Sequence, residues 1–290
     1  RQIGSIVKPV LYLQALSKPN QFSLATMLDD SPIHLKGNQG GWSPQNFDKK
    51  FRGQVTLIQA LSESLNVPTV RLGLKLGLPA LQDGFKRLGL ERDVKLQPSA
   101  FLGAVELTPA EVAQLYQVIA NKGRYIKLAS IESITTTEGT MLHQRRNIVQ
   151  QRVTEDADYL LQYAMQQSTR SGTSKTLANQ FAGIRFAGKT GTSSDHKDSW
   201  FTGFEHESSV TVWLGRDDNK PIGLTGGSGA LTLFSQYFRM VPPNSLFRAI
   251  PPDVTLGRFS VTTGRPVADD CDGSMLLPKV VSATLLTDCE

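Results

Sequence analysis

Residues 5–16, with the sequence SIVKPVLYLQAL, carry most of the information about the fold of this chain. Almost all of them are apolar, which is typical of a helix buried on every side. Pro9 lies close enough to the start of this helix to be tolerated. Ser5 and Lys8 are three positions apart and therefore share one helix face, where an amine could take the proton of a hydroxyl. The stretch predicts a buried helix that carries a candidate nucleophile and its base.

The Ser-x-x-Lys pattern is weak on its own, because it occurs by chance in a chain of this length. A second copy runs from Ser194 to Lys197. It lies in a polar loop with no apolar helix to hold the two side chains together. We interpret this second copy as solvated surface.

Two further elements support a site at Ser5. Ser64-Leu65-Asn66 ends a predicted helix just before Pro68, and the segment 188–192 (GKTGT) lies on a predicted strand. Each also has a purely structural interpretation, because Ser and Asn often end helices and Lys-Thr-Gly often leads into a turn. The order, the long spacings and the local settings of the three elements together predict one site.

Hydrophobic periodicity predicts helices followed by a β-meander. Thr108-Pro109-Ala110-Glu111 is a helix start with a capping box, Pro68 interrupts or restarts a helix, and Pro251-Pro252 marks a boundary. The predicted helices are 5–16, 55–65, 109–120, 154–168 and 227–239, and the predicted strands are 184–192, 199–205, 209–216 and 256–261. Residues 17–53 are predicted to be loop.

The composition is that of an ordinary globular protein of one large or two modest domains. The net charge is +5 and the isoelectric point is near 9.2. These values are compatible with an acidic substrate. The sequence has no stretch in which basic and aromatic residues alternate, as nucleic-acid binding would favour. No apolar run approaches the about 18 residues that span a bilayer, and no signal peptide opens the chain.

The chain has two cysteines, Cys271 and Cys289, in a C-terminal stretch rich in Pro, Gly and Asp. Two free surface thiols are one interpretation. A disulfide closing one short loop is the favoured one, and it implies an oxidising compartment. Neither cysteine has the partners of a metal site, and the four histidines lack ligand spacing, so no metal is expected.

The three motifs together resemble those of the serine penicillin-recognising enzymes. Further stretches are similar to class A bifunctional penicillin-binding proteins, and the tail 252–289 resembles the C-terminal appendage of one branch of that family. These stretches are 1–5 (RQIGS), 42–46 (WSPQN), 103–109 (GAVELTP), 188–192 (GKTGT) and 198–203 (DSWFTG).

The resemblance implies an α/β (α+β) fold, in which helices and a helical subdomain cover an antiparallel sheet. It implies a transpeptidase domain over residues 1–250 and a small appendage over 251–290. Because the chain begins four residues before Ser5, we expect a piece truncated at its N-terminus, with about three strands where the whole domain has five.

The resemblance also implies a serine D,D-transpeptidase without a cofactor. Ser5 attacks the carbonyl between the last two D-alanines of a peptidoglycan stem peptide, and β-lactams acylate the same hydroxyl. Lys8 acts as base, since burial and the charge of Lys189 both lower its pKa. Ser64 relays a proton, and Asn66 holds Lys8 and the substrate amide.

The remaining implied roles concern substrate binding. Lys189, Thr190 and Thr192 hold the terminal carboxylate, and Gly191 leaves room for the approaching substrate. The N–H groups of Ser5 and Thr192 form the oxyanion hole.

For the whole protein, the resemblance implies a place at the periplasmic face of the bacterial inner membrane. It also implies a membrane anchor, a glycosyltransferase domain and an outer-membrane lipoprotein as activator, and no nucleic acid.

Three alternatives stay open on the sequence, besides a Ser-His-Asp triad that the scattered histidines do not favour. A class A β-lactamase needs a glutamate that positions water, but neither Glu63 nor Glu106 lies in a Glu-x-x-x-Asn setting, and Leu65 replaces that family's aspartate. A D,D-carboxypeptidase would use the same residues and release the acyl group to water. A penicillin sensor or silent scaffold would share acylation without turnover.

Overall fold

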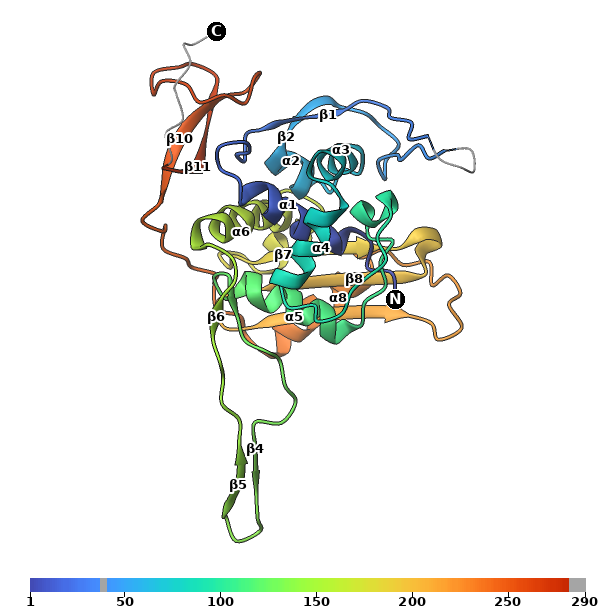
Figure 1. The fold of residues 1–290 in the computed structure, drawn as a ribbon, viewed down its shortest axis with the longest axis vertical. Coiled ribbons are helices and arrows are strands. Elements are labelled where there is room, and N and C mark those ends of the chain that lie inside the picture. Colours follow the sequence, from blue (N-terminus) through green and yellow to red (C-terminus); the bar gives the residue numbers. More distant parts are fainter. Residues whose placement is uncertain (37–40, 282–290) are drawn as a thin grey trace.

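A computed structural model describes residues 1–36 and 41–281. Its element order is helical first, then strand-rich, as the ribbon shows (Figure 1). The helices are η1 (Gly4–Val7), α1 (Lys8–Leu16), α2 (Leu57–Ser62), α3 (Val67–Leu76), α4 (Leu78–Arg87), η2 (Pro98–Leu102), α5 (Pro109–Ala120), α6 (Glu155–Arg170), α7 (Thr176–Gln180), η3 (Ser194–His196) and α8 (Ala230–Met240). The strands are β1 (Met27–Asp30), β2 (Gly53–Thr56), β3 (Arg124–Tyr125), β4 (Ser133–Thr135), β5 (Met141–Gln144), β6 (Gln150–Gln151), β7 (Ala187–Thr192), β8 (Asp198–Phe204), β9 (Ser209–Gly215), β10 (Val254–Ser260) and β11 (Ser274–Val280).

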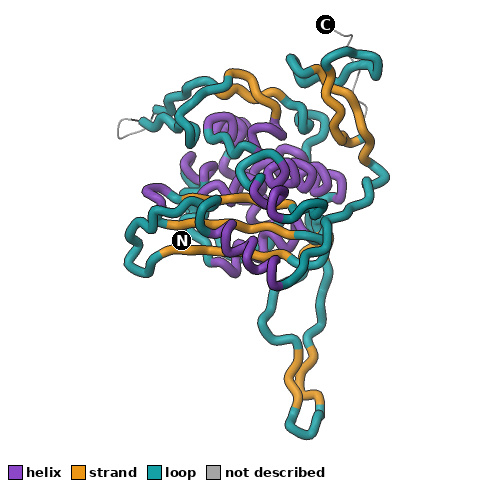
Figure 2. Tube along the Cα trace, turned by 180° about the vertical axis from the view of Figure 1, so that it is seen from behind, coloured by secondary structure: helices purple, strands orange, loops and turns teal. Residues whose placement is uncertain are grey.

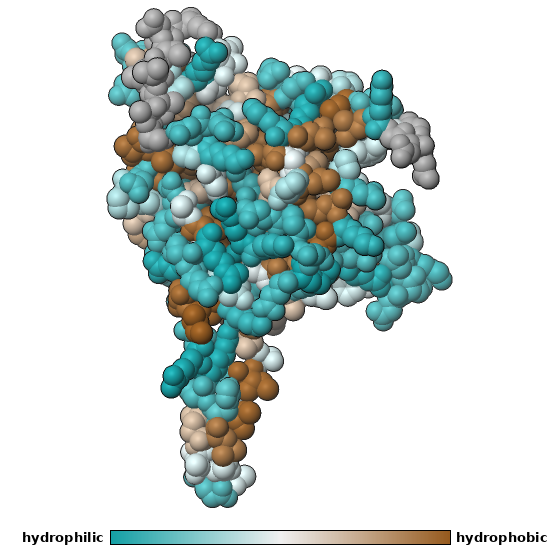
Figure 3. Space-filling view, viewed as in Figure 1, coloured by the Kyte–Doolittle hydropathy of each residue, from teal (hydrophilic) through white to brown (hydrophobic). Residues whose placement is uncertain are grey.

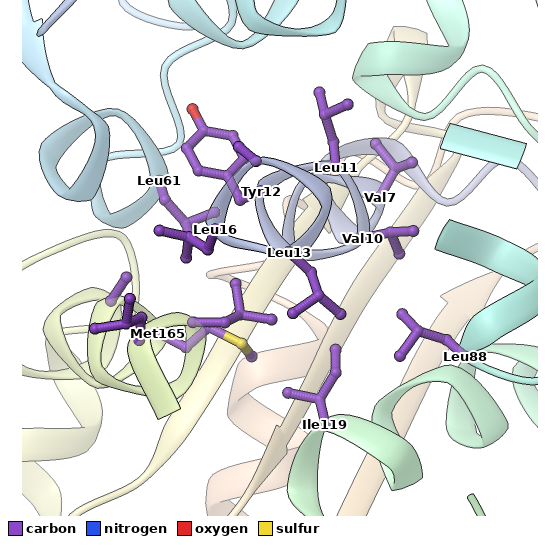
Figure 4. Packing of buried hydrophobic residues seen from close by; sticks show 14 of the residues in the cluster. Val7, Val10, Leu11, Tyr12, Leu13, Leu16, Leu61, Leu88, Ile119 and Met165 are labelled. Atoms are coloured by element: carbon purple, nitrogen blue, oxygen red, sulfur yellow. The ribbon is translucent and has the colours of Figure 1, made fainter. Parts of the chain in front are cut away.

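Helix α1 is the centre of the main core, as its apolar sequence predicts. All nine of its residues are buried. Side chains of α1 are surrounded by residues of other helices, among them Leu61, Leu88, Ile119 and Met165 (Figure 4). A helix that is apolar all round is stable only in such a place, and this packing fixes the direction in which Lys8 leaves the helix.

Strands β7, β8 and β9 form an antiparallel sheet in that order. The central strand β8 is buried along its whole length and alternates between two cores. Trp200 belongs to the main core on the side of α5, whereas Phe201 stacks edge-on against Phe234 of α8 on the other side. The sheet is therefore covered by helices on both faces (Figure 2).

The segment before α1 is held in place by two distant parts of the chain. The N–H groups of Ile3 and Gly4 donate to the carbonyls of Val105 and Gly103, and Trp200 Nε1 donates to Gln2 O at 2.9 Å. These hydrogen bonds help to position Ser5, in addition to the packing of its own helix.

Much of the predicted secondary structure is confirmed. The three strands of the meander occur as β7, β8 and β9, and α8 packs back on their sheet. Thr108 and Glu111 form both hydrogen bonds of the capping box. Helix α6 matches the prediction for 154–168, and Pro68 lies in the first turn of α3, where it restarts the helix.

Two parts of the prediction are wrong. The helix expected over 55–65 begins only at Leu57, because Val55 and Thr56 pair with β1, and Thr56 then caps the helix. The predicted loop 17–53 also contains β1.

The β4–β5 arm, a hairpin within residues 127–150, was not predicted from the sequence. It projects from the body of the molecule and carries exposed apolar side chains (Figure 3). Its strand residues are exposed throughout, so burial against the main core does not hold this hairpin in place.

The C-terminal region is an antiparallel hairpin of β10 and β11. Val254, Phe259 and Leu277 from this hairpin join the main core. The division into 1–250 and 251–290 stays a prediction. The predicted Cys271–Cys289 bridge also stays a prediction, because Cys289 lies outside the described residues. Among the residues described, no helix is both long and apolar enough to cross a bilayer.

Candidate active site

A cleft of about 830 Å³ lies between the helical region and the β7 edge of the sheet. Both Ser5 and Ser64 open into it, together with Asn66, Thr190 and Thr192. Five of the eight predicted catalytic and substrate-binding residues therefore line one cavity, although they lie up to 187 positions apart. Lys8 and Lys189 are fully buried directly behind this lining.

Ser5 lies on the single turn η1, which a glycine makes possible. Gly4 has φ of +52°, and a Cβ there would be 2.4 Å from the carbonyl oxygen of Thr192. Only glycine allows this close approach of the nucleophile turn to the end of β7. The buried hydroxyl of Tyr116 donates to Ile6 O at 2.9 Å and fixes the same turn from below.

The hydroxyl of Ser5 is half-exposed in the cleft. Among the residues that the structure describes, it has no hydrogen-bond partner. A nucleophile needs this access to an incoming carbonyl carbon.

Lys8 extends from α1 to the turn between α2 and α3. Its Nζ contacts Ser64 O at 2.6 Å, Asn66 Oδ1 at 2.8 Å, Leu65 O at 3.1 Å and Ser64 Oγ at 3.3 Å. The amine thus joins the Ser-x-x-Lys and Ser-x-Asn elements directly.

Two effects lower the pKa of Lys8 well below its usual value. Removal from water is the larger effect, and the positive charge of Lys189 is the second. The oxygen atoms around Nζ act in the opposite direction, because hydrogen bonds to an ammonium are stronger than those to a neutral amine. The net lowering of the pKa favours a form of Lys8 that can accept a proton.

Ser64 links the two lysines. Its hydroxyl oxygen lies 3.3 Å from Lys8 Nζ and accepts from Lys189 Nζ at 2.7 Å. Its backbone has φ of +58°, a sparsely populated conformation for a residue with a side chain. Burial lowers the pKa of Lys189 to about 7. The result is a continuous polar chain from Lys8 through Ser64 to Lys189.

The two threonines of β7 have defined supports. Thr190 Oγ1 donates to Thr173 Oγ1 at 3.2 Å, and Thr192 Oγ1 accepts from the N–H of Gly226 at 2.9 Å. These bonds hold two hydroxyls along one side of the cleft, in line with the Lys189 ammonium behind it.

Comparison with known proteins agrees with this geometry. Residues 2–230 match the family described as penicillin binding protein transpeptidase domain. This chain belongs to that family.

Two relatives in the transpeptidase family are penicillin-binding proteins 1B. The chain is 44% identical over 280 residues to the protein of Vibrio cholerae, covering 96% of this chain and 36% of that protein. It is 40% identical over 258 residues to the protein of Escherichia coli, covering 88% and 31% respectively. The predicted resemblance to one branch of the family is confirmed, and that branch is penicillin-binding protein 1B. The chain spans about a third of the length of these relatives.

The fold of the transpeptidase family is also confirmed by solved structures. Penicillin-binding protein 1A from Haemophilus influenzae superposes with a TM-score of 0.89 at 24% identity, over 100% of this chain and 49% of that chain. PonA1 from Mycobacterium tuberculosis superposes with a TM-score of 0.73 at 21% identity, over 87% of this chain and 72% of that chain.

Gly191 has a structural reason in addition to the predicted one, which stays a prediction. A Cβ at Gly191 would lie 2.6 Å from both Ile3 O and Ile6 Cγ1. The missing side chain therefore makes room for the nucleophile turn, and Gly191 is not part of the cleft lining among the described residues.

Sequence reasoning missed three groups that support the site. Thr173 contacts Thr190, Gly226 contacts Thr192, and Asn46 hydrogen-bonds the backbone of Asn66. Only Asn46 carried a signal, because the WSPQN stretch is one of those that resemble the family.

The competing motifs do not form a second site. Ser194 is exposed at the mouth of the cleft, and Lys197 lies 3.8 Å from Asp195 rather than in a buried pair. His34 Nδ1 contacts Ser43 Oγ at 2.9 Å, but both residues are exposed and, among the described residues, no carboxylate contacts this histidine.

Neither glutamate considered for a β-lactamase, Glu63 or Glu106, is placed as a free base for water. Glu63 lines the cleft but pairs with Arg52 at 3.1 Å and accepts from Gln59. Glu106 is exposed at an isolated bridge with Gln2 and is not itself among the described residues that line the cleft. Neither is in a setting that favours a free base for water.

Proposed function

We propose that this chain is a serine D,D-transpeptidase, with Ser5 as nucleophile and Lys8 as its base. The observation that carries the proposal is the chain of contacts from Lys8 Nζ through Ser64 Oγ to Lys189 Nζ, set behind the cleft that exposes Ser5. Three sequence elements far apart in the chain contribute to it. The network places the proposed base, Ser64 and the Lys189 charge directly behind the lining that exposes the proposed nucleophile.

In the first half-reaction, Ser5 Oγ attacks the carbonyl carbon between the two terminal D-alanines. Neutral Lys8 accepts the hydroxyl proton, and the carbonyl oxygen becomes an oxyanion. Collapse breaks the C–N bond, and the proton reaches the leaving nitrogen through Ser64, so that D-alanine departs as an amine. The products are an acyl-enzyme ester on Ser5 and free D-alanine.

In the second half-reaction, the amine of another stem peptide attacks the ester. Lys8 takes a proton from the attacking nitrogen and returns it to Ser5 Oγ as the C–O bond breaks. The enzyme is regenerated, and an amide bond links two strands. A β-lactam follows the first half-reaction, with cleavage of its ring amide.

Substrate orientation is the task of β7 in this proposal. The terminal carboxylate of the donor lies against the Thr190 and Thr192 hydroxyls, with the Lys189 charge close behind. The N–H groups of Ser5 and Thr192 form the oxyanion hole; the proposal is supported by the close approach of the Gly4 turn to Thr192, which leaves no room for a Cβ at Gly4. Asn66 holds Lys8 and the donor amide.

The further domains, partners and location of the longer protein are also proposed, from the similarity to its relatives. The chain spans about a third of the penicillin-binding proteins 1B that it resembles, so the membrane anchor, glycosyltransferase domain and lipoprotein activator belong to our proposal for a longer protein. The periplasmic face of the inner membrane is the proposed location. Binding of β-lactams is supported by the solved complex of PonA1 with penicillin V.

A D,D-carboxypeptidase is the second candidate, since it would use the same residues and differ in the acceptor. The test is turnover of a D-alanyl-D-alanine donor with and without an amine acceptor. A transpeptidase gives an acceptor-dependent amide product whose yield rises with acceptor concentration. Release of the hydrolysed donor alone, at all acceptor concentrations, would assign carboxypeptidase activity. A stable acyl-enzyme without turnover would indicate a sensor.

A further inference from the structure

The side chain of Asn46 lies behind the Ser64–Asn66 turn, in the loop between β1 and β2. It is 3% exposed and hydrogen-bonded at both ends of its amide. Its Oδ1 accepts from the N–H groups of Asn66 at 2.8 Å and Val67 at 3.2 Å. Its Nδ2 donates to both Asp30 oxygens, at 2.7 and 2.9 Å, and to Lys50 O at 2.7 Å.

These partners allow one orientation of the Asn46 amide. The Asp30 carboxylate and the Lys50 carbonyl can only accept, so the amide nitrogen must face them. The amide oxygen then faces the start of α3. Asp30 is itself fully buried, and it is held by the Arg52 N–H at 3.0 Å and by the Arg52 guanidinium at 3.9 Å.

The orientation of the Asn46 amide affects Asn66, which precedes the first residue of α3. An asparagine at this position normally turns its side chain back to cap its own helix. Asn66 instead has helical φ and ψ of −85° and −47° and forms no side-chain cap. The Asn46 oxygen accepts from the N–H groups of Asn66 and Val67 and so holds the backbone of Asn66, whose side chain reaches Lys8.

The neighbouring residue completes the arrangement. Gln45 O accepts from Asn66 Nδ2 at 2.8 Å, which turns Asn66 Oδ1 toward Lys8 Nζ at 2.8 Å. Two consecutive residues of one loop therefore fix both the backbone and the side-chain amide of Asn66.

We propose that Asn46 is a positioning residue for acylation, which acts on Lys8 through Asn66. This inference rests on the proposed function, because it assigns Asn46 to the same reaction at Ser5. Without Asn46, the N–H groups of Asn66 and Val67 lose their shared acceptor, the Asn66 turn is no longer held, and the Lys8 amine loses one of the contacts that aim it.

The test is a double-mutant cycle of Asn46→Ala and Asn66→Ala in the 290-residue chain. The measured quantity is the second-order rate constant for acylation of Ser5 by benzylpenicillin, corrected for the folded fraction. We expect Asn46→Ala to lower it about 10- to 100-fold, because small displacements of a catalytic group have effects of this size. In the Asn66→Ala background we expect Asn46→Ala to change it less than about twofold.

A pH profile separates positioning from a loss of stability. The charged groups that surround this unit are Asp30 on β1, Arg52 with its partners Asp48 and Glu63, and Lys8 and Lys189 beyond the turn. Loss of the Asn66 oxygen removes an acceptor that favours the ammonium form of Lys8. The acid limb of the acylation profile should therefore move to lower pH as the plateau falls.

The matched control is Thr108→Ala, which removes the cap of α5 and does not touch Asn66. It should lower the melting temperature and leave the acylation rate constant and its pH profile unchanged. If Asn46→Ala does not fold, the exchange Asp30→Asn/Asn46→Asp is compared with Asn46→Asp alone. The exchange restores a donor opposite an acceptor and should acylate at least about tenfold faster than the single variant, in which two carboxylates meet.

Equal effects of Asn46→Ala in both backgrounds, or no effect in the wild-type background, would overturn the inference. Failure of the wild-type protein to acylate at Ser5 would instead overturn the proposed function. The two failures are therefore distinguishable in one set of measurements.

Discussion

The Nζ atom of Lys189 lies 2.7 Å from the hydroxyl oxygen of Ser64, although 125 positions separate the two residues in the chain. The contact joins strand β7 to the turn between α2 and α3 and completes the link to Lys8. Each proposed role depends on this meeting of sheet and helices.

Replacement of Lys8 should abolish acylation while Ser5 is still present. Both Lys8→Ala and Lys8→Arg should lower the acylation rate constant by about 10² to 10⁴, the usual contribution of a general base. Arginine fails because its guanidinium stays protonated. The control is Lys86→Ala, which removes an exposed lysine paired with Asp93. Stopped-flow acylation by a fluorescent penicillin measures the effect, and near-normal acylation of Lys8→Arg would contradict it.

The Lys189 charge should set the alkaline limit of acylation. Burial lowers the pKa of Lys189 to about 7, so the free enzyme loses this positive charge as pH rises through about 7, and affinity for the donor carboxylate falls. Lys189→Arg keeps its charge over this range. We expect the acylation efficiency of the wild-type protein to decline above about pH 7 and that of Lys189→Arg to stay level. Identical alkaline limbs would show that another group titrates.

Gly191→Ala should disturb the nucleophile turn rather than the substrate. The added Cβ would meet Ile3 O and Ile6 at 2.6 Å, and overpacking of this kind costs about 1 to 3 kcal/mol. Acylation should slow at saturating penicillin, with less effect on the half-saturating concentration. Gly139→Ala is the control, because Gly139 has φ of +87° in the remote β4–β5 arm with no atom within 4 Å of an added Cβ. A change confined to half-saturation would favour the substrate-crowding explanation.

The predicted Cys271–Cys289 bridge should stabilise the C-terminal hairpin without affecting the site. By the loop-entropy relation, a bridge that closes a loop of this length contributes about 3 kcal/mol. Cys271→Ser should lower the melting temperature of the hairpin region and leave acylation unchanged. Non-reducing peptide mapping checks the pairing directly, and two alkylatable thiols in the native protein would refute it.

The sequence could predict the elements of the site better than their supports. Ser5, Lys8, Ser64 and Lys189 lie in three short motifs that are weak separately, and the resemblance of their combination to one enzyme family implies their roles. The positive φ of Ser64 was not predicted, since it arises from tertiary contacts rather than from residue preference.

The residues that support the site were not predicted for the same physical reason, because their contacts are tertiary. Asn46 binds Asp30, Asn66 and Val67, which lie 16 to 21 positions away. Thr173, which precedes α7, binds Thr190 of strand β7. No periodicity links such residues. The start of α2 was misplaced because pairing of Val55 with Leu28 overrides the helical preference of the segment. The β4–β5 arm lacks the buried face that periodicity detects.

The most direct test of the central claim is mass spectrometry of the intact protein after incubation with benzylpenicillin, followed by mapping of the modified peptide. We expect one covalent adduct per chain, located on Ser5 and absent from Lys8→Ala. An adduct on another residue, or an unmodified protein that is fully folded, would contradict it.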